Sequence, residues 1–354
     1  MQLVRPFDQT DIPKVASLHH RVFKTEIPPD SELYGNYFRS VFLASHGADF
    51  TSLVCETDGA ITGFLGVVLR PLLWGDRRLR AAVSSQFVVE PGSHSWLAGV
   101  ELLRRFLAGP QDLSITDEAN DASRRLWIRL GGTQSLFSSV QWMLPLRPCR
   151  LGLIAARKWL GRWVAPLTPL AKPADFVAGR LAGLPRFLAS SNLRAWKPDV
   201  SMLLQMSREF AGDFLQPAYD AGEFSRILEW ASRKRGGVLH PVALNGQDGK
   251  PAGWYIYHKN GRGEAELLQI GAREDTVMDV LDHLIGHSWR SGAYCVSGRM
   301  EPLLAPALAK RICLLSPYRR CVLLHTRDAA LRNVIECGTG FLSRLDGEWS
   351  LRLQ

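Results

Sequence analysis

One short stretch of the sequence, residues 112–132 (DLSITDEANDASRRLWIRLGG), predicts a strand followed by a helix whose two ends are both marked. Residues 113–116 alternate apolar and polar side chains, as a half-buried strand does. Asn120 then precedes an apolar-periodic run, which is the position of a helix N-cap, and Gly131 follows that run, where helices commonly end. A strand that leads directly into a capped helix restricts the chain to folds in which strands and helices alternate.

The same alternation extends through residues 1–145. Asp58-Gly59 lies between two apolar runs and is a strong signal for a β-hairpin. Pro91-Gly92 ends a further run that is rich in β-branched residues. The expected elements are an opening strand near Arg5, a helix over 15–23, strands over 52–55, 61–69 and 81–89, and a helix over 95–107. This order predicts one sheet with helices packed against it, which is an α+β class of fold.

The pattern Asn-x-x-small-x-x-Leu-aromatic-x-x-x-Gly, which begins at Asn120, resembles part of the acyl-CoA binding core of the GNAT acyltransferase superfamily. The resemblance implies an acyl-CoA, such as acetyl-CoA, as donor and an amine of a small molecule or amino sugar as acceptor. In that superfamily the aromatic residue is often a Tyr that protonates the departing thiolate. Trp127 stands at this position, and an indole N–H cannot act as that acid.

Val89-Glu90-Pro91 also resembles the superfamily, in which a long strand ends in Val-x-Pro before a phosphate-binding loop. The resemblance aligns residues 94–99 with that loop, whose N–H groups hold the CoA pyrophosphate at a helix N-terminus. Leu97 replaces the first glycine of the loop, which leaves either a working CoA site or a lobe kept for its structure. The resemblance implies the following cofactor-binding residues: Phe87, Val88, Val89, His94, Ser95, Ala98, Gly99, Asn120 and Trp127.

Two acidic residues, Asp117 and Glu118, are expected to form a turn at the end of strand 113–116. A carboxylate at this place in a GNAT protein often serves as the catalytic base or anchors the substrate, so the resemblance implies this role for the pair. The alternative is that both stabilise the positive end of the following helix. The polar run 84–86 within an apolar strand predicts either a cleft or hydrogen bonds across the sheet.

The second half of the chain repeats the pattern of the first. The turn Asp248-Gly249 leads to Gly253-Trp254, as Asp58-Gly59 leads to Gly63-Phe64. Further elements are expected over 264–270, 276–289, 293–297 and 302–310. The whole chain resembles the bacterial tandem-GNAT proteins, in which usually one of two related lobes keeps a CoA site. We therefore expect an α+β fold with a GNAT-like domain at 1–145, a basic and partly helical connector at 146–200, and a degenerate GNAT-like domain at 201–354.

The expected connector has an unusual charge. Residues 146–200 contain ten basic and two acidic side chains, so they carry +8 of the formal net charge of +9. Within 151–167, a helix would place Arg157, Lys158 and Arg162 opposite a face of Trp159, Leu160, Trp163, Val164 and Leu167. Such a helix suits peripheral contact with a membrane, where the protein would use a long-chain acyl donor. The alternative is a connecting helix that buries its tryptophans between the lobes.

Other classes of protein are disfavoured by what the sequence lacks. It has no helix-turn-helix pattern or zinc knuckle, so we expect no nucleic-acid partner despite the basic stretch. Six scattered cysteines without metal-ligand spacing predict reduced thiols and no metal site. No apolar run is long enough for a transmembrane helix and no signal sequence is recognisable, so the expected location is the cytoplasm, with a homodimer as one assembly to consider. A non-catalytic tandem-GNAT protein that binds a ligand or partner remains an alternative to the enzyme.

Overall fold

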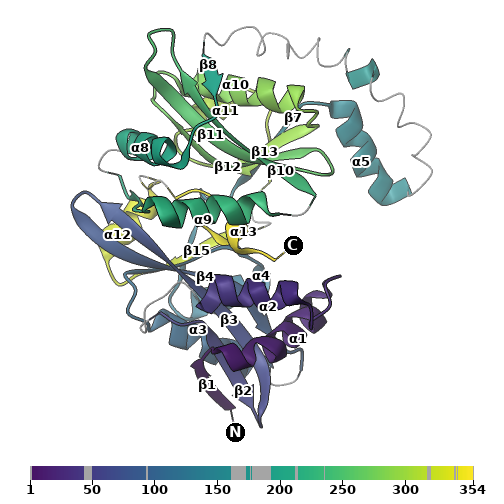
Figure 1. Cartoon of the computed structure of the whole chain (residues 1–354), viewed down its shortest axis with the longest axis vertical. Coiled ribbons are helices and arrows are strands. Elements are labelled where there is room, and N and C mark those ends of the chain that lie inside the picture. Colours follow the sequence, from purple (N-terminus) through teal and green to yellow (C-terminus); the bar gives the residue numbers. More distant parts are fainter. Residues whose placement is uncertain are drawn as a thin grey trace.

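Two mixed β-sheets form the framework of the protein (Figure 1). The computed structural model describes residues 2–43, 50–92, 95–160, 173–175, 177, 193–211, 214–234, 236–316, 320–338, 340 and 342–353. The sheets lie one beyond the other along the long axis, with helices and the C-terminal segment between them. The expected α+β class is confirmed.

The first sheet is built mostly from the N-terminal half of the chain. Its order is β1 (Gln2–Pro6), β2 (Leu53–Thr57), β3 (Ala60–Trp74), β4 (Arg77–Val89), β5 (Leu113–Ala119), β15 (Cys321–His325) and β6 (Thr133–Ser135), with β9 (Gln216–Pro217) added on β3. Only β4 and β5 run parallel. The short helix η1 (Gln9–Asp11), α1 (Ile12–Phe23), α2 (Glu32–Phe38) and the π-turn η2 (Arg39–Leu43) lie toward one face, and α3 (Ser95–Leu107) and α4 (Asp121–Arg129) cover the other.

The second sheet follows the same plan. Its order is β8 (Arg194–Trp196), β10 (Gly237–Asn245), β11 (Pro251–Asn260), β12 (Glu264–Ala272), β13 (Cys295–Arg299), β7 (Gln141–Pro145) and β14 (Leu314–Ser316). Here β12 and β13 are the parallel pair. Helices α8 (Val200–Ala211) and α9 (Ala221–Ser232) pack on one face, and α10 (Val277–Arg290) and α11 (Ala305–Ala309) pack on the other. Further helices of the described residues are α5 (Pro148–Leu160), α12 (Ala329–Glu336) and α13 (Glu348–Leu351).

The two sheets exchange one strand each. In the first sheet β15, from the C-terminal half, lies between β5 and β6, and in the second sheet β7, from the N-terminal half, lies between β13 and β14. The exchanged strand β7 is fixed by Trp142, whose ring lies over Gly298 of β13, where an added Cβ would come within 2.7 Å of it. The Trp142 Nε1 also donates a hydrogen bond to the Arg299 carbonyl at 2.9 Å.

Because of this exchange, the expected domain boundaries at residues 145 and 200 do not coincide with the division of the strands between the two sheets. Strand β7 lies within the expected first domain but completes the second sheet, and β15 does the reverse. Strand β8, within the expected connector, forms an edge of the second sheet. Periodicity identifies short strands without identifying their partners, which explains why the sequence pattern did not predict these pairings.

Several expected elements have the bounds that the sequence predicts. The helix over 95–107 is α3, and the Asp58-Gly59 turn, with φ of 50° and 82°, joins β2 to β3. The expected acidic turn is wrong, because Asp117 and Glu118 lie within β5. Pairing with β15 extends this strand as far as Ala119.

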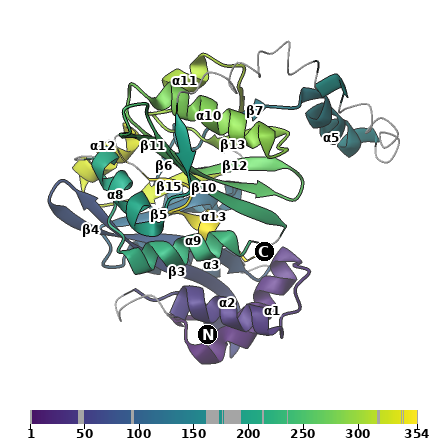
Figure 2. The same cartoon turned by 45° about the horizontal axis from the view of Figure 1, so that its top comes forward.

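Helix α5 stands away from both sheets (Figure 2). Its first turn is held by Asp175, whose Oδ1 accepts a hydrogen bond from the Cys149 N–H at 2.7 Å. Trp159 is 90% exposed, so the alternative in which this tryptophan is buried between the lobes is wrong. The side chains of Lys158 and Leu160 and all of residues 161–172, including Trp163, Val164 and Leu167, lie outside the described residues. Among the helices that the structure describes, none is long and apolar enough to cross a bilayer.

Two histidines of α10 make the stability of the second sheet sensitive to acid. His283 and His287 pack beside Tyr255 and Tyr257, and the Tyr255 hydroxyl lies 2.9 Å from Nδ1 of His283. Burial, followed by the charges of neighbouring basic groups, lowers the pKa of each histidine to about 4.

We expect the melting temperature to fall as the pH drops from about 6.5 to about 4. In this range the unfolded chain takes up protons at both histidines, whose ordinary pKa is about 6.5, before the folded chain does. Thermal unfolding followed by circular dichroism at several pH values tests this. The double variant His283→Gln/His287→Gln should show a smaller loss over the same range, and an equal loss would contradict the assignment.

Candidate functional site

A gap opens in the first sheet between the two parallel strands β4 and β5. Their pairing covers only residues 81–83 of β4 and 113–115 of β5. Beyond this point β4 continues to Val89 and β5 continues to Ala119 without pairing to each other. Over about half of their length, the main-chain groups of the two strands therefore form no hydrogen bonds with each other. The closed end of the gap, which we call the apex, lies next to Val83 and Ile115.

A bulge at Gln86 shapes the β4 side of this gap. Gln86 has a φ of 53°, and the register with β3 shifts there. As a result Val83 and Val88, which simple alternation would place on opposite faces, both pack with α1 and α2. The Gln86 Oε1 lies 2.7 Å from Nε2 of His19 on α1, so this residue bonds to the helix above the sheet. The buried Ser85 hydroxyl has no hydrogen-bond partner among the residues described.

Two main-chain N–H groups of β4 face the gap. The Glu90 N–H donates to the Thr62 carbonyl of the neighbouring chain segment at 2.8 Å. Because successive N–H groups along a strand point to opposite sides, the N–H of Val88 faces β3, and those of Phe87 and Val89 face the gap. Of the three residues expected to offer an N–H there, Phe87 and Val89 therefore have the required direction and Val88 does not.

The residues aligned with a phosphate loop lie mostly in the first turns of α3. The helix begins at Ser95, and Ala98 and Gly99 are buried. A Cβ on Gly99 would lie 3.7 Å from side-chain atoms of Phe87 and Val89, so Gly99 packs against the β4 side of the gap. Trp96 and Leu97 are exposed on the first turn. His94 and the side chain of Ser95 lie outside the described residues.

The helix that follows β5 has a capped start and a buried aromatic residue. The Asn120 Oδ1 accepts a hydrogen bond from the Ser123 N–H at 2.9 Å, which confirms the predicted N-cap. Trp127 is 1% exposed and lies edge-on to Phe106, with ring centroids 6.0 Å apart. Both residues thus have structural roles, and we leave Trp127 out of the proposed site because no part of its side chain is accessible to a ligand.

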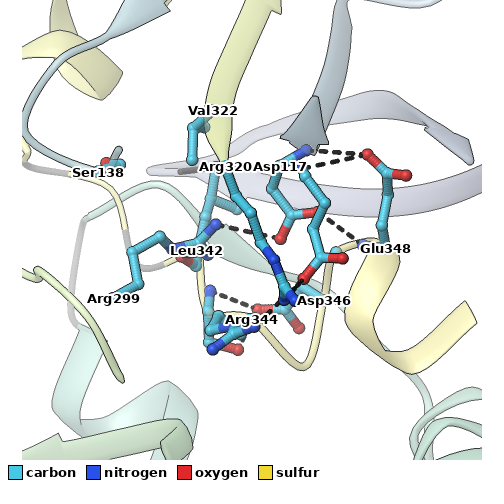
Figure 3. A network of polar contacts seen from close by, with 12 residues as sticks. Asp117, Ser138, Arg299, Arg320, Val322, Leu342, Arg344, Asp346 and Glu348 are labelled. Atoms are coloured by element: carbon cyan, nitrogen blue, oxygen red, sulfur yellow. Dashed lines mark hydrogen bonds and ion pairs between the residues drawn. The ribbon is translucent and has the colours of Figure 1, made fainter. Parts of the chain in front are cut away.

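Two carboxylates meet at the apex of the gap (Figure 3). The Asp117 Oδ1 accepts a hydrogen bond from the Glu348 N–H at 2.7 Å, and the Glu348 Oε1 accepts one from the Asp117 N–H at 3.2 Å. Glu348 Oε1 also accepts from the Glu118 N–H at 3.3 Å and from the Thr116 hydroxyl. Gly347 allows this contact, because a Cβ there would lie 2.1 Å from Asp117 Oδ2.

Arginines from the second half of the chain surround the two predicted catalytic carboxylates, Asp117 and Glu118. Figure 3 labels Asp117 with Arg299, Arg320 and Arg344. Asp117 forms an ion pair with Arg299 at 3.1 Å, and both side chains are buried. Glu118 forms ion pairs with Arg320 at 2.9 Å, with Arg344 at 3.2 Å and with Arg352. These contacts fix Asp117 and Glu118 in place, and they favour an anchoring role over that of a catalytic base.

Glu348 has different chemistry from its neighbours. Burial, and next the negative charge of Asp117, raises the pKa of Glu348. This shift favours the protonated form of Glu348, which is the form that a general acid needs. Glu348 was not predicted from the sequence, because the residue lies 231 positions from Asp117 and belongs to no motif.

A narrow cavity of about 60 Å³ reaches the apex from the side of the second sheet. It is lined by Val83 of β4, by Ile115 and Asp117 of β5, and by Arg299 and Glu301 from the second half of the chain. The apex is thus accessible from between the sheets, and a small group could approach it there. No set of three or more side chains suited to bind a metal occurs among the described residues.

Comparison with known proteins shows similarity in structure only. No protein-family model matches the sequence, and no curated protein matches it. A probable N-acyltransferase from Enterococcus faecalis aligns with a TM-score of 0.61 at 11% identity, over 92% of this chain and 73% of that one. A GCN5-related N-acetyltransferase from Anabaena variabilis aligns with a TM-score of 0.58 at 12% identity, over 93% and 73%. Saccharomyces cerevisiae N-myristoyltransferase, solved with myristoyl-CoA, aligns with a TM-score of 0.53 at 10% identity, over 91% and 79%.

Proposed function

We propose that this chain, which has the fold of the GCN5-related N-acetyltransferases, transfers an acyl group from acyl-CoA to an amine. The observation that carries the proposal is the gap between β4 and β5, with free N–H groups on one side and the Asp117–Glu348 pair at its apex. In this reaction the amine nitrogen attacks the thioester carbonyl. A C–N bond forms, the C–S bond breaks, and CoA leaves as its thiol.

The residues of the gap supply what this reaction needs. The N–H groups of Phe87 and Val89 would hold the thioester arm and stabilise the carbonyl oxygen as it gains negative charge. The N-terminus of α3, which begins at Ser95, would attract the pyrophosphate, because a helix N-terminus favours anions. Protonated Glu348 would donate its proton to the departing thiolate, which is a role that Trp127 cannot fill. The proton that the nitrogen loses as it becomes an amide would then return to the Glu348 carboxylate.

A charge placed on α3 tests the donor site. In Leu97→Glu, a carboxylate replaces an exposed leucine on the first turn of α3, close to where the pyrophosphate would bind. Repulsion between this charge and the two pyrophosphate charges, at about 5 Å in water, amounts to about 1.5 kcal/mol. We therefore expect roughly tenfold weaker binding of acetyl-CoA or palmitoyl-CoA in calorimetric titrations.

Arg104→Glu is the matched control, because Arg104 is exposed in the last turn of the same helix. It should bind acyl-CoA as the wild type does, apart from the weak general effect of net charge. If Leu97→Glu binds acyl-CoA as tightly as Arg104→Glu, the donor does not bind at the N-terminus of α3. If the wild type binds neither acyl-CoA, the chain is not an acyl-CoA-dependent enzyme, and a non-catalytic binding protein becomes the better proposal.

A membrane-peripheral form of the enzyme is the second candidate. The observation that favours it is the exposure of both Trp159 and Arg157 on α5, which stands away from the sheets. A helix that exposes an indole on one face and a cation on another suits an anionic lipid surface. Cosedimentation with phosphatidylglycerol vesicles, which Trp159→Ser should reduce, tests this candidate.

A further inference from the structure

A second and much larger cavity, of about 970 Å³, lies in the second half of the molecule. It opens beside the C-terminal end of β12 and the start of α10, where Gly271 and Val277 line it. Helices α8 and α11 form its sides through residues such as Phe210 and Pro306, and Leu303, which precedes α11, adds to the wall. Its volume is within the range of small-molecule sites, and its walls are mostly apolar.

The two cavities meet at Glu301. Both are lined by Glu301, Pro302, Gly338, Gly340 and Leu342. Glu301 follows β13 closely, and among the described residues no hydrogen bond or ion pair engages its carboxylate. A ligand that fills the large cavity would therefore meet the Glu301 carboxylate where that cavity joins the passage to the apex at Asp117.

We propose that the large cavity binds the acyl acceptor, an amine carried on an apolar body, with its ammonium group at Glu301 and its apolar part against Phe210, Trp254 and Leu303. The identification of this ligand as an acyl acceptor rests on the proposed acyl transfer. The binding of an apolar amine at this place stands on the cavity alone.

The chemistry of the cavity selects this class of ligand. An apolar wall stabilises a hydrocarbon part by about 25 cal/mol per Å² of area removed from water. A carboxylate without a partner in such surroundings is costly, and a cation that pairs with it removes this cost. Arg299, whose positive charge acts on Glu301, is already paired with Asp117, and Asp346 adds negative charge nearby.

The protonation of Glu301 agrees with this assignment. Burial raises the pKa of Glu301 to about 7, although the Arg299 guanidinium acts in the opposite direction. An ammonium ion that binds there would restore the ionised form. A ligand with the same apolar part and no charge would gain only from the walls.

Two probes that differ only in charge test the site, namely octylamine and 1-octanol, titrated calorimetrically in the absence of any CoA. We expect wild-type protein to bind octylamine at least tenfold more tightly than 1-octanol, because a hydrogen bond to a charged group contributes about 1.5–3 kcal/mol. In Glu301→Gln, the same shape without the charge, this preference should disappear while the affinity for 1-octanol stays the same.

A second variant ties the binding to the cavity. Leu303→Trp places a larger side chain on the cavity wall and should weaken both probes, whereas Leu136→Trp, at an exposed leucine elsewhere, should weaken neither. Equal affinity of the wild type for both probes, or a preference that persists in Glu301→Gln, would overturn the proposal. These outcomes are independent of acyl-CoA binding, so failure of the acceptor site and failure of the donor site are distinguishable.

Discussion

Arg299→Met is expected to lower the free energy of unfolding by about 3–5 kcal/mol, since it leaves a buried carboxylate without its cation. Arg299 pairs with Asp117 at 3.1 Å, and the side chains are 6% and 3% exposed. Arg299 also donates a hydrogen bond from Nη2 to the Leu342 carbonyl at 3.0 Å, which this variant loses too. Because Asp117 belongs to the first sheet and Arg299 to the second, the loss should weaken the contact between the sheets. Urea unfolding followed by fluorescence measures the change.

The double variant Arg299→Met/Asp117→Asn separates the ion pair from general disruption of packing. An asparagine at position 117 carries no charge, and its side-chain oxygen can still accept the hydrogen bond from the Glu348 N–H. We expect the double variant to regain at least half of the stability that the single variant loses. If the losses of stability caused by Arg299→Met and by Asp117→Asn add instead, the buried charge is not the cause. An unchanged stability of Arg299→Met would show that the ion pair does not stabilise the fold.

Neither half of the chain is expected to fold alone, while the two halves expressed together should assemble. If the chain is cut between residues 160 and 193, the first half lacks β15 and the second half lacks β7. Each sheet then loses the strand that holds its sixth position, and unpaired strand edges promote aggregation. Separate expression should therefore give insoluble protein, and co-expression should give a soluble complex that copurifies through a tag on one half.

A shorter first half provides the control for this experiment. A first half that ends before Gln141 lacks β7 and should no longer rescue the second half. Copurification at the level of the longer fragment would mean that β7 is dispensable for the second sheet. A first half that is soluble and monomeric alone would show that β15 is dispensable for the first sheet.

The parts of the fold that were predictable from the sequence are those encoded by neighbouring residues. Helix α3 has an apolar stripe and follows Pro91-Gly92, so both its type and its limits are local properties. The same holds for the Asp58-Gly59 hairpin, where positive φ values require such residues. Strands β6 and β15 were not predicted, because they have three and five residues and their partners lie far away in the sequence.

The candidate site divides in the same way. The gap-facing residues Phe87 and Val89 belong to a long strand whose end is visible in the sequence, so their position was predictable. Glu348 belongs to the site through a contact with Asp117, which is 231 residues away in the sequence. Glu301 belongs to it because it lines the cavity that leads to the apex. No local sequence pattern identifies either residue. Trp127 was expected to contact the cofactor, but it packs in the core. The sequence could not decide between the two, because an aromatic residue at this helical position suits a core and a ligand site equally well.

The exchange of strands also sets an order of events during synthesis. The first sheet can form as far as β5 and β6 soon after those strands leave the ribosome, but the place between them stays empty until β15 has been made. For most of translation the nascent chain therefore presents two open strand edges, which another chain could occupy. Slowed or interrupted translation after β6 should for this reason yield aggregates, and a chaperone that shields these edges would raise the yield of the protein.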